Sequence, residues 1–376
     1  MYKKRADLAV SKKINITILV APLDWGLGHA TRCIPLIRHL IITGCNVIIA
    51  TEGAQEYLLK REFPQLEFVH LSGYHIKYAT NKRFFALKIL AQLPNILLSI
   101  RKEKKCLKNL INNKKINAVI SDNRYGLYNK KIDSIIITHQ LTIKAPVVIV
   151  EKLMRIFNYK LIRKFNSCWI PDLAEVPNLA GVLSHPTKLP DISTRYLGAL
   201  SRFNRKDNGE ERFNLLVVIS GPEPQRTIFE NKLLLQLQNF EGKVMFVRGL
   251  PATHEPLQTT TKNIEVRNHL DATEMERAFH ESEIVISRSG YTTVMDICKL
   301  QKKSILIPTP GQTEQEYLAR HLQKQGWCMT VAQKDFQLKE QLEKSKNFNF
   351  QLPHLDMETY KVVLDQFIDT LEKRGI

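Results

Sequence analysis

Residues 21–32, APLDWGLGHATR, gather groups suited to acid–base chemistry at the start of a helix. Gly26 and Gly28 let the backbone approach a ligand closely, and the N–H groups of a helix start attract an anion or an oxygen-rich group. His29 is a candidate general base, because imidazoles titrate near working pH. Asp24 is a candidate to orient His29 or to act as the base itself. The alternative is a helix-capping turn with a solvated histidine.

A second loop, residues 287–296 (SRSGYTTVMD), directly follows the apolar run EIVI. Hydroxyl and N–H groups at a helix start suit a diphosphate. The residues that supply them are Ser289, Gly290, Thr292 and Thr293. Asp296 follows about one turn later, where its carboxylate can accept hydrogen bonds from a ribose diol. An ordinary Ser/Gly cap is the alternative.

Two further loops follow apolar runs in the same half of the chain. In residues 308–317, Gln312, Gln315 and Glu316 are polar groups able to bind sugar hydroxyls, unless they are solvated helix residues. In residues 220–226, Gly221 opens a turn and Arg226 offers a guanidinium fork to phosphate. Together the loops predict anion and sugar chemistry in both halves.

The elements that must position these loops are predicted strands alternating with helices. The apolar runs are nearly continuous, as in parallel strands covered on both faces, and strand–helix repeats indicate a doubly wound α/β sheet. The predicted strands are 14–22, 45–51, 66–71, 116–122, 134–139 and 167–172, then 213–220, 243–249, 263–270, 283–290 and 303–309. Two helices are clearest, at 31–44 and at 357–371.

The polar stretch 201–210 indicates a linker between two domains. We predict an α/β protein with two Rossmann-like, doubly wound parallel-sheet domains, 1–204 and 205–376, with a cleft between them. The last helix is expected to pack back on the first domain. Ligands bind at the carboxyl ends of strands in such sheets, where all four loops lie.

Net charge and cysteine spacing limit the classes of binding partner and the compartment that the protein can have. The 376 residues carry a formal net charge of +18, which fits nucleic acid, an anionic membrane surface or phosphorylated substrates. The six cysteines lack C-x-x-C spacing, which favours buried thiols in a reducing compartment over a zinc site. The sequence shows no signal-peptide cleavage site and no apolar run of the about 18–20 residues needed to span a bilayer. We therefore predict a cytosolic protein.

Two basic amphipathic stretches, 84–113 and 151–166, suggest contact with an anionic bilayer. The alternative is a solvated helix face over core leucines. No nucleic-acid partner is expected, since the sequence contains no recognised nucleic-acid-binding domain and no pattern of basic and aromatic residues typical of a nucleic-acid-binding platform.

The stretch SEIVISRSGYTTVMDICKLQKKSILIPTPGQTEQEYLA, residues 282–319, resembles the carboxyl half of GT-B glycosyltransferases. It is most similar to the family 28 group that contains the peptidoglycan N-acetylglucosaminyl transferase. The opening Gly-Leu-Gly-His matches the group's glycine-rich turn ending in histidine. The resemblance implies a nucleotide-sugar donor, UDP-linked, bound mainly by the carboxyl half, and a glycan or lipid-linked acceptor.

The resemblance also implies roles for particular residues. Asp296 would hold the ribose hydroxyls, and Gln315 with Glu316 would read the donor sugar, where the family more often has two glutamines. Ser289 and Gly290 would line the phosphate side. His269 and Leu270 would face the uracil, and His29 would act at the acceptor.

Departures from the family pattern concern mainly the acceptor side. Asp24 and Trp25 stand where the family has glycines, so a different acceptor pocket is expected. The family's phosphate loop is replaced by SGPEPQR at 220–226. By position, Asn123, Arg124 and His139, with Gln140 beside it, are expected to face the same cleft.

The implied reaction is a single displacement with inversion at the anomeric carbon. His29 or Asp24 removes the acceptor proton, while helix starts and Arg226 or Arg288 stabilise the departing diphosphate. No Asp-x-Asp pair follows a strand, so no metal or other cofactor is expected. Two alternatives stay open: a UDP-sugar 2-epimerase of the same fold, and a nucleotide-sugar-binding protein without catalysis.

Overall fold

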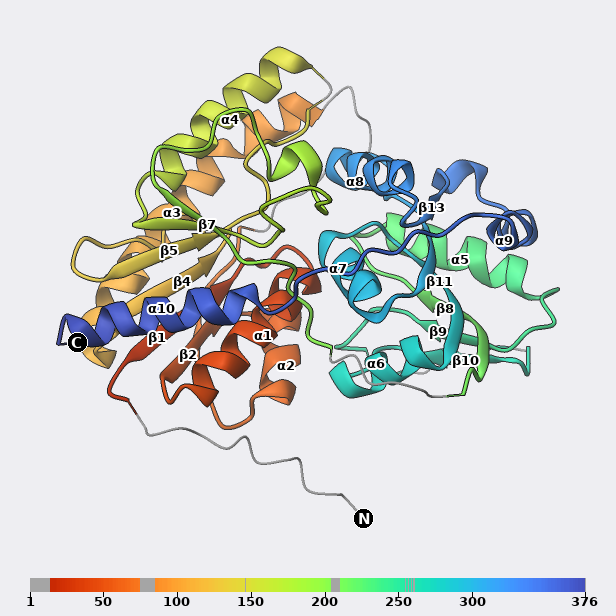
Figure 1. The fold of residues 1–376 in the computed structure, drawn as a ribbon, viewed down its shortest axis with the longest axis horizontal. Helices are drawn as coiled ribbons and strands as arrows, with labels where there is room; N and C mark the ends of the chain where they lie inside the picture. Colours follow the sequence, from red (N-terminus) through yellow and green to blue (C-terminus); the bar gives the residue numbers. More distant parts are fainter. Residues whose placement is uncertain are drawn as a thin grey trace.

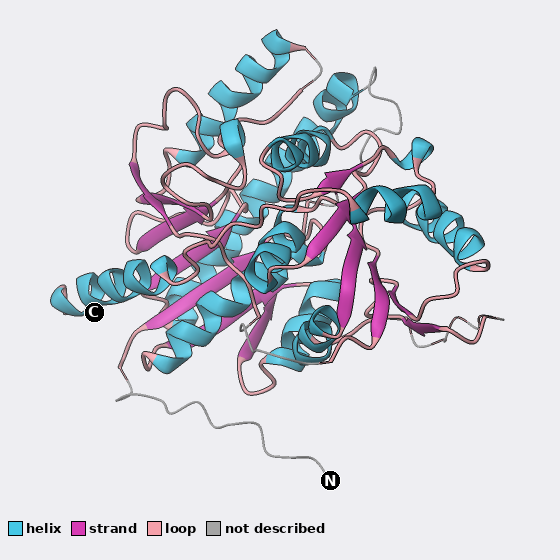
Figure 2. Ribbon diagram, turned by 45° about the vertical axis from the view of Figure 1, so that its right-hand side comes forward, coloured by secondary structure: helices cyan, strands magenta, loops and turns pink. Residues whose placement is uncertain are grey.

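The computed structural model consists of two α/β halves that lie side by side (Figure 1). It describes residues 14–74, 85–145, 147–203, 210–253, 255, 257, 259 and 261–375. In each half, helices cover the strands on the outside (Figure 2). Most of the linker predicted at 201–210 lies outside the described residues.

The first half is built on a seven-stranded sheet in the order β3-β2-β1-β4-β5-β6-β7, with every pair parallel. Its strands are β1 Thr17–Pro22, β2 Asn46–Thr51, β3 Glu67–His70, β4 Ala118–Asp122, β5 Asp133–Ile137, β6 Ser167–Ile170 and β7 Ser193–Tyr196. Its helices are α1 Leu27–Ile42, α2 Gly53–Glu62, α3 Phe85–Lys114 and α4 Val148–Ile162, with a short 3-10 turn at Gly181–Leu183.

The second half repeats this plan on a six-stranded parallel sheet in the order β10-β9-β8-β11-β12-β13. Its strands are β8 Phe213–Val218, β9 Val244–Val247, β10 Ile264–Arg267, β11 Ser282–Ser287, β12 Lys303–Leu306 and β13 Met329–Thr330. Its helices are α5 Gln225–Leu237, α6 Ala272–His280, α7 Tyr291–Leu300, α8 Thr313–Lys324 and α9 Leu338–Lys346, with a 3-10 turn at Gln333–Asp335.

The prediction of two doubly wound parallel sheets is confirmed. The central strands are buried along almost their whole length, as their continuous apolar runs indicated. In both sheets the strand order reverses at the first strand, β1 or β8. Loops that follow β1 and β4, or β8 and β11, therefore flank the two switch points, where ligands bind in such folds.

Two features join the halves. α10, Thr359–Lys373, crosses back from the second half and packs on α1 and β7 (Figure 1). His39 Nε2 lies 2.6 Å from Asp365 Oδ1, and the Trp169 and Phe367 rings meet edge to face. α1 also packs against α7, and one buried apolar cluster extends through both halves.

All six cysteines are free thiols, five of them buried and Cys106 partly exposed. The described residues contain no group of three or more histidine, cysteine or acidic side chains placed to hold a metal ion. In the same residues no helix combines the length and apolar character required to cross a bilayer.

Candidate active site at the junction of the halves

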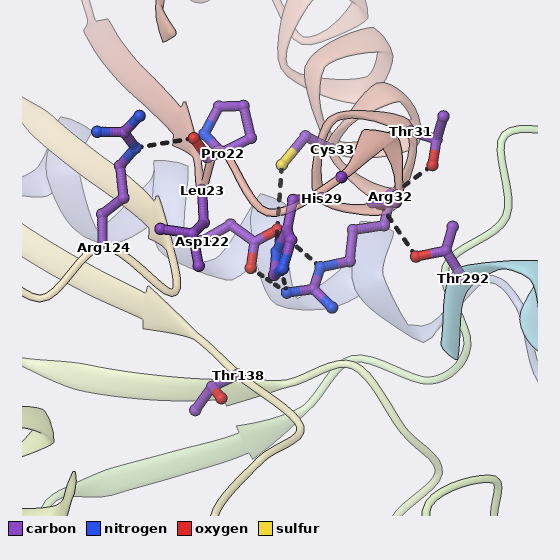
Figure 3. A network of polar contacts seen from close by, with 12 residues as sticks. Pro22, Leu23, His29, Thr31, Arg32, Cys33, Asp122, Arg124, Thr138 and Thr292 are labelled. Atoms are coloured by element: carbon purple, nitrogen blue, oxygen red, sulfur yellow. Dashed lines mark hydrogen bonds and ion pairs between the residues drawn. The ribbon is translucent and has the colours of Figure 1, made fainter. Parts of the chain in front are cut away.

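The histidine predicted as a base lies in the first turn of α1, at the switch point of the first sheet. Gly26, with φ 72°, turns the chain from β1 into the helix without a side-chain cap. His29 Nδ1 lies 3.1 Å from Oδ2 of Asp122, the last residue of β4 (Figure 3). Only 12% of the His29 side chain is exposed, and 1% of Asp122.

Arg32, one turn further along α1, joins this pair to a second histidine. Its Nε donates to Asp122 Oδ2 at 2.7 Å, and its Nη2 donates to Oδ1 of the same carboxylate. Nη2 also lies 2.8 Å from His29 Nδ1, and Nη1 lies 3.3 Å from His139 Nδ1. The guanidinium is 2% exposed, so these contacts form away from bulk water.

Burial and charge shift the titration of these groups. Burial and the charge of Arg32 lower the pKa of His29, against the opposing effect of Asp122. Burial alone would raise the pKa of Asp122, but Arg32 and His29 hold it well below its usual range. The site therefore holds an uncharged imidazole beside an ionised carboxylate at neutral pH.

The expectation that Asp24 orients His29 is wrong, because the carboxylate on Nδ1 belongs to Asp122. Asp24 Oδ1 instead accepts the backbone N–H of Tyr74 at 2.9 Å. Trp25 packs against an apolar cluster that includes Tyr74. Both residues thus bind the loop after β1 to the loop after β3.

The second half reaches this site through the first turns of α7 and α8. Thr292 Oγ1 donates to the Gly28 carbonyl at 3.0 Å (Figure 3). His139 stacks on the ring of Tyr291, with centroids 3.9 Å apart, and its Nε2 lies 2.8 Å from Glu314 Oε1. The start of α1 and the start of α7 are therefore in contact across the junction.

The predicted phosphate and sugar residues of the second half also lie together. α7 begins after Gly290 without a side-chain cap. Ser289 Oγ donates to the Gln315 carbonyl at 2.9 Å, and Gln315 Nε2 contacts Gln312 Oε1 at 2.5 Å. Near the start of α8, the backbone N–H of Gly311 donates to Glu316 Oε1 at 3.4 Å. A hydrogen bond thus connects the loops after β11 and β12, and Thr293 belongs to the first turn of α7.

A small cavity of about 20 Å³ lies between α1, α2 and the loop after β10. Arg202 and His269 line it, and Arg202 Nε, which lacks a hydrogen-bond partner among the described residues, is 3.9 Å from Asp296 Oδ2. Ser201 Oγ donates to Asp296 Oδ1 at 2.6 Å. Burial raises the pKa of Asp296 to about 6 and lowers that of His269 to about 4.

Three arginines that the sequence placed in the site instead make contacts that stabilise the fold. Arg226 pairs with Glu223 at 2.6 Å and Glu230 at 2.8 Å, so its fork is already occupied. Arg288 is 1% exposed, lies over the Phe229 ring and donates to the Gln225 carbonyl.

Arg124 is fully buried and donates to Glu103 and to the carbonyls of Pro22, Leu71 and Ser72, so it does not line the acceptor side. Asn123 next to it has φ 57° and is buried, with its side-chain oxygen unpartnered among the described residues. Leu270 is a core residue, and Gly221, φ 109°, lies beside Thr309.

Four functional candidates escaped the sequence argument: Arg32, Asp122, Glu314 and Arg202. Asp122 stood within the expected strand 116–122, and its position at a strand end of the switch point was the available signal. Arg32 and Glu314 each lie near a residue that the sequence singled out. Nothing local marks Arg202, because its partners come from α7 and the loop after β10.

Comparison with known proteins finds similarity to glycosyltransferases. Residues 223–360 match the glycosyltransferase family 28 C-terminal domain. A UDP-N-acetylglucosamine--N-acetylmuramyl-(pentapeptide) pyrophosphoryl-undecaprenol N-acetylglucosamine transferase of Caldanaerobacter subterraneus is 27% identical over 154 residues. That match spans 37% of this chain and 42% of the relative, so the chain aligns with less than half of the relative's length.

Solved structures match over nearly the whole chain. The spinosyn rhamnosyltransferase SpnG has a TM-score of 0.60 at 13% identity, covering 95% of this chain and 96% of its own. The crystal structure of Acinetobacter baumannii MurG has a TM-score of 0.50 at 14% identity, covering 95% and 99%. The fold is therefore the two-domain GT-B fold, and the chain resembles the family 28 glycosyltransferases.

Proposed function

We propose that this chain, whose residues 223–360 match a family 28 glycosyltransferase domain, transfers a sugar from a nucleotide-sugar donor to a hydroxyl group. The donor is UDP-linked, the acceptor is a lipid-linked or glycan hydroxyl, and the reaction inverts the anomeric carbon without a metal. The observation that carries the proposal is the contact between Thr292 and Gly28. It brings the α7 start beside the turn of α1 that holds His29.

In the proposed reaction His29 Nε2 takes the proton of the acceptor hydroxyl. The acceptor oxygen then bonds to the anomeric carbon while the bond to the diphosphate oxygen breaks. Asp122 accepts Nδ1–H of His29 and stabilises the imidazolium that forms. The uncapped N–H groups after Gly290 receive the departing diphosphate, and they supply electrostatic stabilisation without an ion.

The donor half of the proposal rests on Asp296 and its surroundings. A carboxylate beside Arg202 suits a ribose diol, and Arg202 and His269 line the same small cavity. Gln315 and Glu316 lie in the first turn of α8, where the resemblance assigns contacts with the sugar. The UDP-N-acetylglucosamine named for the relative supports a UDP-linked donor here.

A lipid-linked acceptor is supported by the exposed face of α4. Large apolar side chains are exposed to solvent along this helix, at Val148 (70% exposed), Ile149, Leu153, Ile156 (65% exposed) and Phe157. Exposed basic residues lie in its last turn, at Lys160, and directly after it, at Arg163 and Lys164. Apolar groups flanked by cations suit an anionic lipid surface.

The same helix leads directly to the site. Lys144 Nζ pairs with Glu151 of α4 at 3.1 Å, and the Lys144 carbonyl accepts a hydrogen bond from Thr313 at the start of α8. A membrane-bound acceptor would therefore reach the cleft along this edge. We propose that the protein binds peripherally to the inner face of the cytoplasmic membrane through anionic lipids.

The membrane step is tested by vesicle flotation with anionic lipid at low salt. Leu153→Asn with Ile156→Asn is expected to abolish flotation. Leu235→Asn is the matched control, because Leu235 is equally exposed at 66% but lies on α5 in the other half. Unchanged flotation of the double variant, or loss with the control, contradicts the assignment to α4.

The donor and the chemistry are tested together. A thermal-shift panel of UDP, GDP, dTDP, NAD and UDP-sugars should give a rise only with UDP-type ligands. With an acceptor identified, His29→Ala should lower turnover by about 10²–10⁴-fold, while EDTA leaves it unchanged. A flat panel contradicts the donor assignment. Conversion of a UDP-sugar to its epimer without any acceptor would instead identify a 2-epimerase.

A further inference from the structure

One buried guanidinium contacts three titratable side chains of the proposed active site. Arg32 lies between His29, Asp122 and His139, at distances of 2.8 Å, 2.7 Å and 3.3 Å from its nitrogens. The mechanism proposed above uses His29 and Asp122 but gives Arg32 no part. Only 2% of its side chain is exposed, so its position is set by packing as well as by charge.

We propose that Arg32 is a positioning residue that keeps His29 uncharged beside Asp122 and orients His139 to donate to Glu314. This inference rests on the proposed function for its kinetic consequences. Its electrostatic part concerns the folded protein alone and is measurable without substrate.

The first part follows from the charges that face His29. They come from four elements: Arg32 on α1, Asp122 at the end of β4, His139 after β5 and Glu314 at the start of α8. An isolated carboxylate on Nδ1 would favour the imidazolium, which cannot accept a proton. The bidentate pair of Arg32 with Asp122 is neutral as a unit, so the carboxylate orients the ring without holding it protonated.

The second part follows from the hydrogen-bonding capacity of the two groups. A guanidinium has only donors, so Arg32 Nη1 can bond to His139 Nδ1 only when that nitrogen carries no proton. The proton of neutral His139 then lies on Nε2, which faces Glu314 Oε1 at 2.8 Å. Arg32 thereby connects the base in the first half to a carboxylate of the second half.

Arg32 also competes with Asp122 for the same ring nitrogen. When Nδ1 of His29 donates to Asp122, Nε2 is free to accept a proton. When Nδ1 accepts from Arg32 Nη2, Nε2 carries the proton and the ring cannot act as a base. The position of the guanidinium therefore decides what fraction of the neutral ring is active.

The test is a pH titration of ¹⁵N-labelled histidine by NMR, with the His29 signal assigned from His29→Ala. Arg32→Met, or Arg32→Gln where a donor is needed for folding, should raise the His29 midpoint by about one pH unit or more, because the Asp122 charge is then unopposed. Arg32→Lys keeps the charge and should leave the midpoint near the native one, while the His139 tautomer signal changes. Arg38→Met, on the same helix but paired with Glu62, is the matched control and should change neither.

Kinetics separate this inference from the proposed function. If transfer activity is found, the acidic limb of kcat/KM should move to higher pH in the neutral variant, in step with the NMR midpoint. An unchanged or lower midpoint in Arg32→Met and Arg32→Gln overturns the inference, even if the enzyme transfers sugar. A raised midpoint in a protein that transfers no sugar from any donor refutes the proposed function and leaves the role of Arg32 standing.

Discussion

Asp296→Asn is expected to stabilise the folded protein at neutral pH while removing donor binding. Asp296 is 5% exposed, and burial raises its pKa from 3.8 to about 6, although Arg202 and the Ser201 hydroxyl favour the ionised form. Asparagine has nearly the same shape and can still accept from Ser201. It removes the charge that the folded protein holds unfavourably.

The magnitude follows from the difference between the folded and unfolded pKa. A carboxyl whose pKa is raised on folding contributes stability below pH 3.8, and this contribution is lost as the pH rises through about 6. The full loss is about 3 kcal/mol, at about 1.4 kcal/mol for each pH unit. For a chain of 376 residues this corresponds to a change in Tm on the order of 4 °C.

The assay is thermal unfolding of both proteins between pH 5 and pH 8. The Tm of the variant should rise relative to that of the native protein as the pH increases. This difference in Tm should level off about one unit above pH 6. Asp369→Asn, an exposed position on α10, is the control and should show no pH-dependent difference. In the same samples UDP should stabilise the native protein and not the variant.

Two results would refute the reasoning. A variant less stable than the native protein at pH 8 would mean that the Arg202 contact outweighs the burial of the charge. A constant difference from pH 5 to pH 8 would mean that Asp296 keeps the same proton occupancy in the folded and unfolded chain. Donor binding retained by the variant would leave the stability argument intact and remove Asp296 from the ribose site.

Two further predictions concern Glu314, at the junction of the halves, and Gly126, in the loop after β4. Glu314→Gln should destabilise the protein by about 1–2 kcal/mol at pH 7, because it removes a charged partner of His139. Burial alone would raise the pKa of Glu314, but His139, His29 and Arg32 together hold it below its usual value. The difference from the native protein should therefore vanish in thermal scans as the pH falls below 4.5. Gly126→Ala places a Cβ 2.3 Å from the Ile100 carbonyl, and it should lower the free energy of unfolding in urea by about 1–3 kcal/mol; an unchanged midpoint would show that α3 can yield there.

The fold was predictable where strands are buried on both faces. The central strands β1, β4, β8 and β11 are unbroken apolar runs, and the sequence located each of them. β7 and β13 were missed because they are edge strands of four and two residues, and their partly exposed polar positions resemble a loop. Edge strands gain less from burial, so their composition is less restricted.

The site was predictable only as a set of loops. His29 and the start of α7 follow strands and could be placed at one sheet edge by topology alone. Asp122 lies 93 residues from His29, so its pairing depends on the register between β1 and β4, which no local pattern specifies. The prediction for Arg226 was wrong for the opposite reason, because its carboxylate partners are only three and four residues away in the sequence.

The return of α10 to the first half has a consequence for synthesis on the ribosome. The first half is complete in sequence after β7, yet its surface beside Trp169 and α1 is covered by a helix made more than 160 residues later. Domains usually fold in the order in which they emerge. Here the nascent first half keeps that apolar surface uncovered while the whole second half is translated, and a chaperone would meet it in that interval.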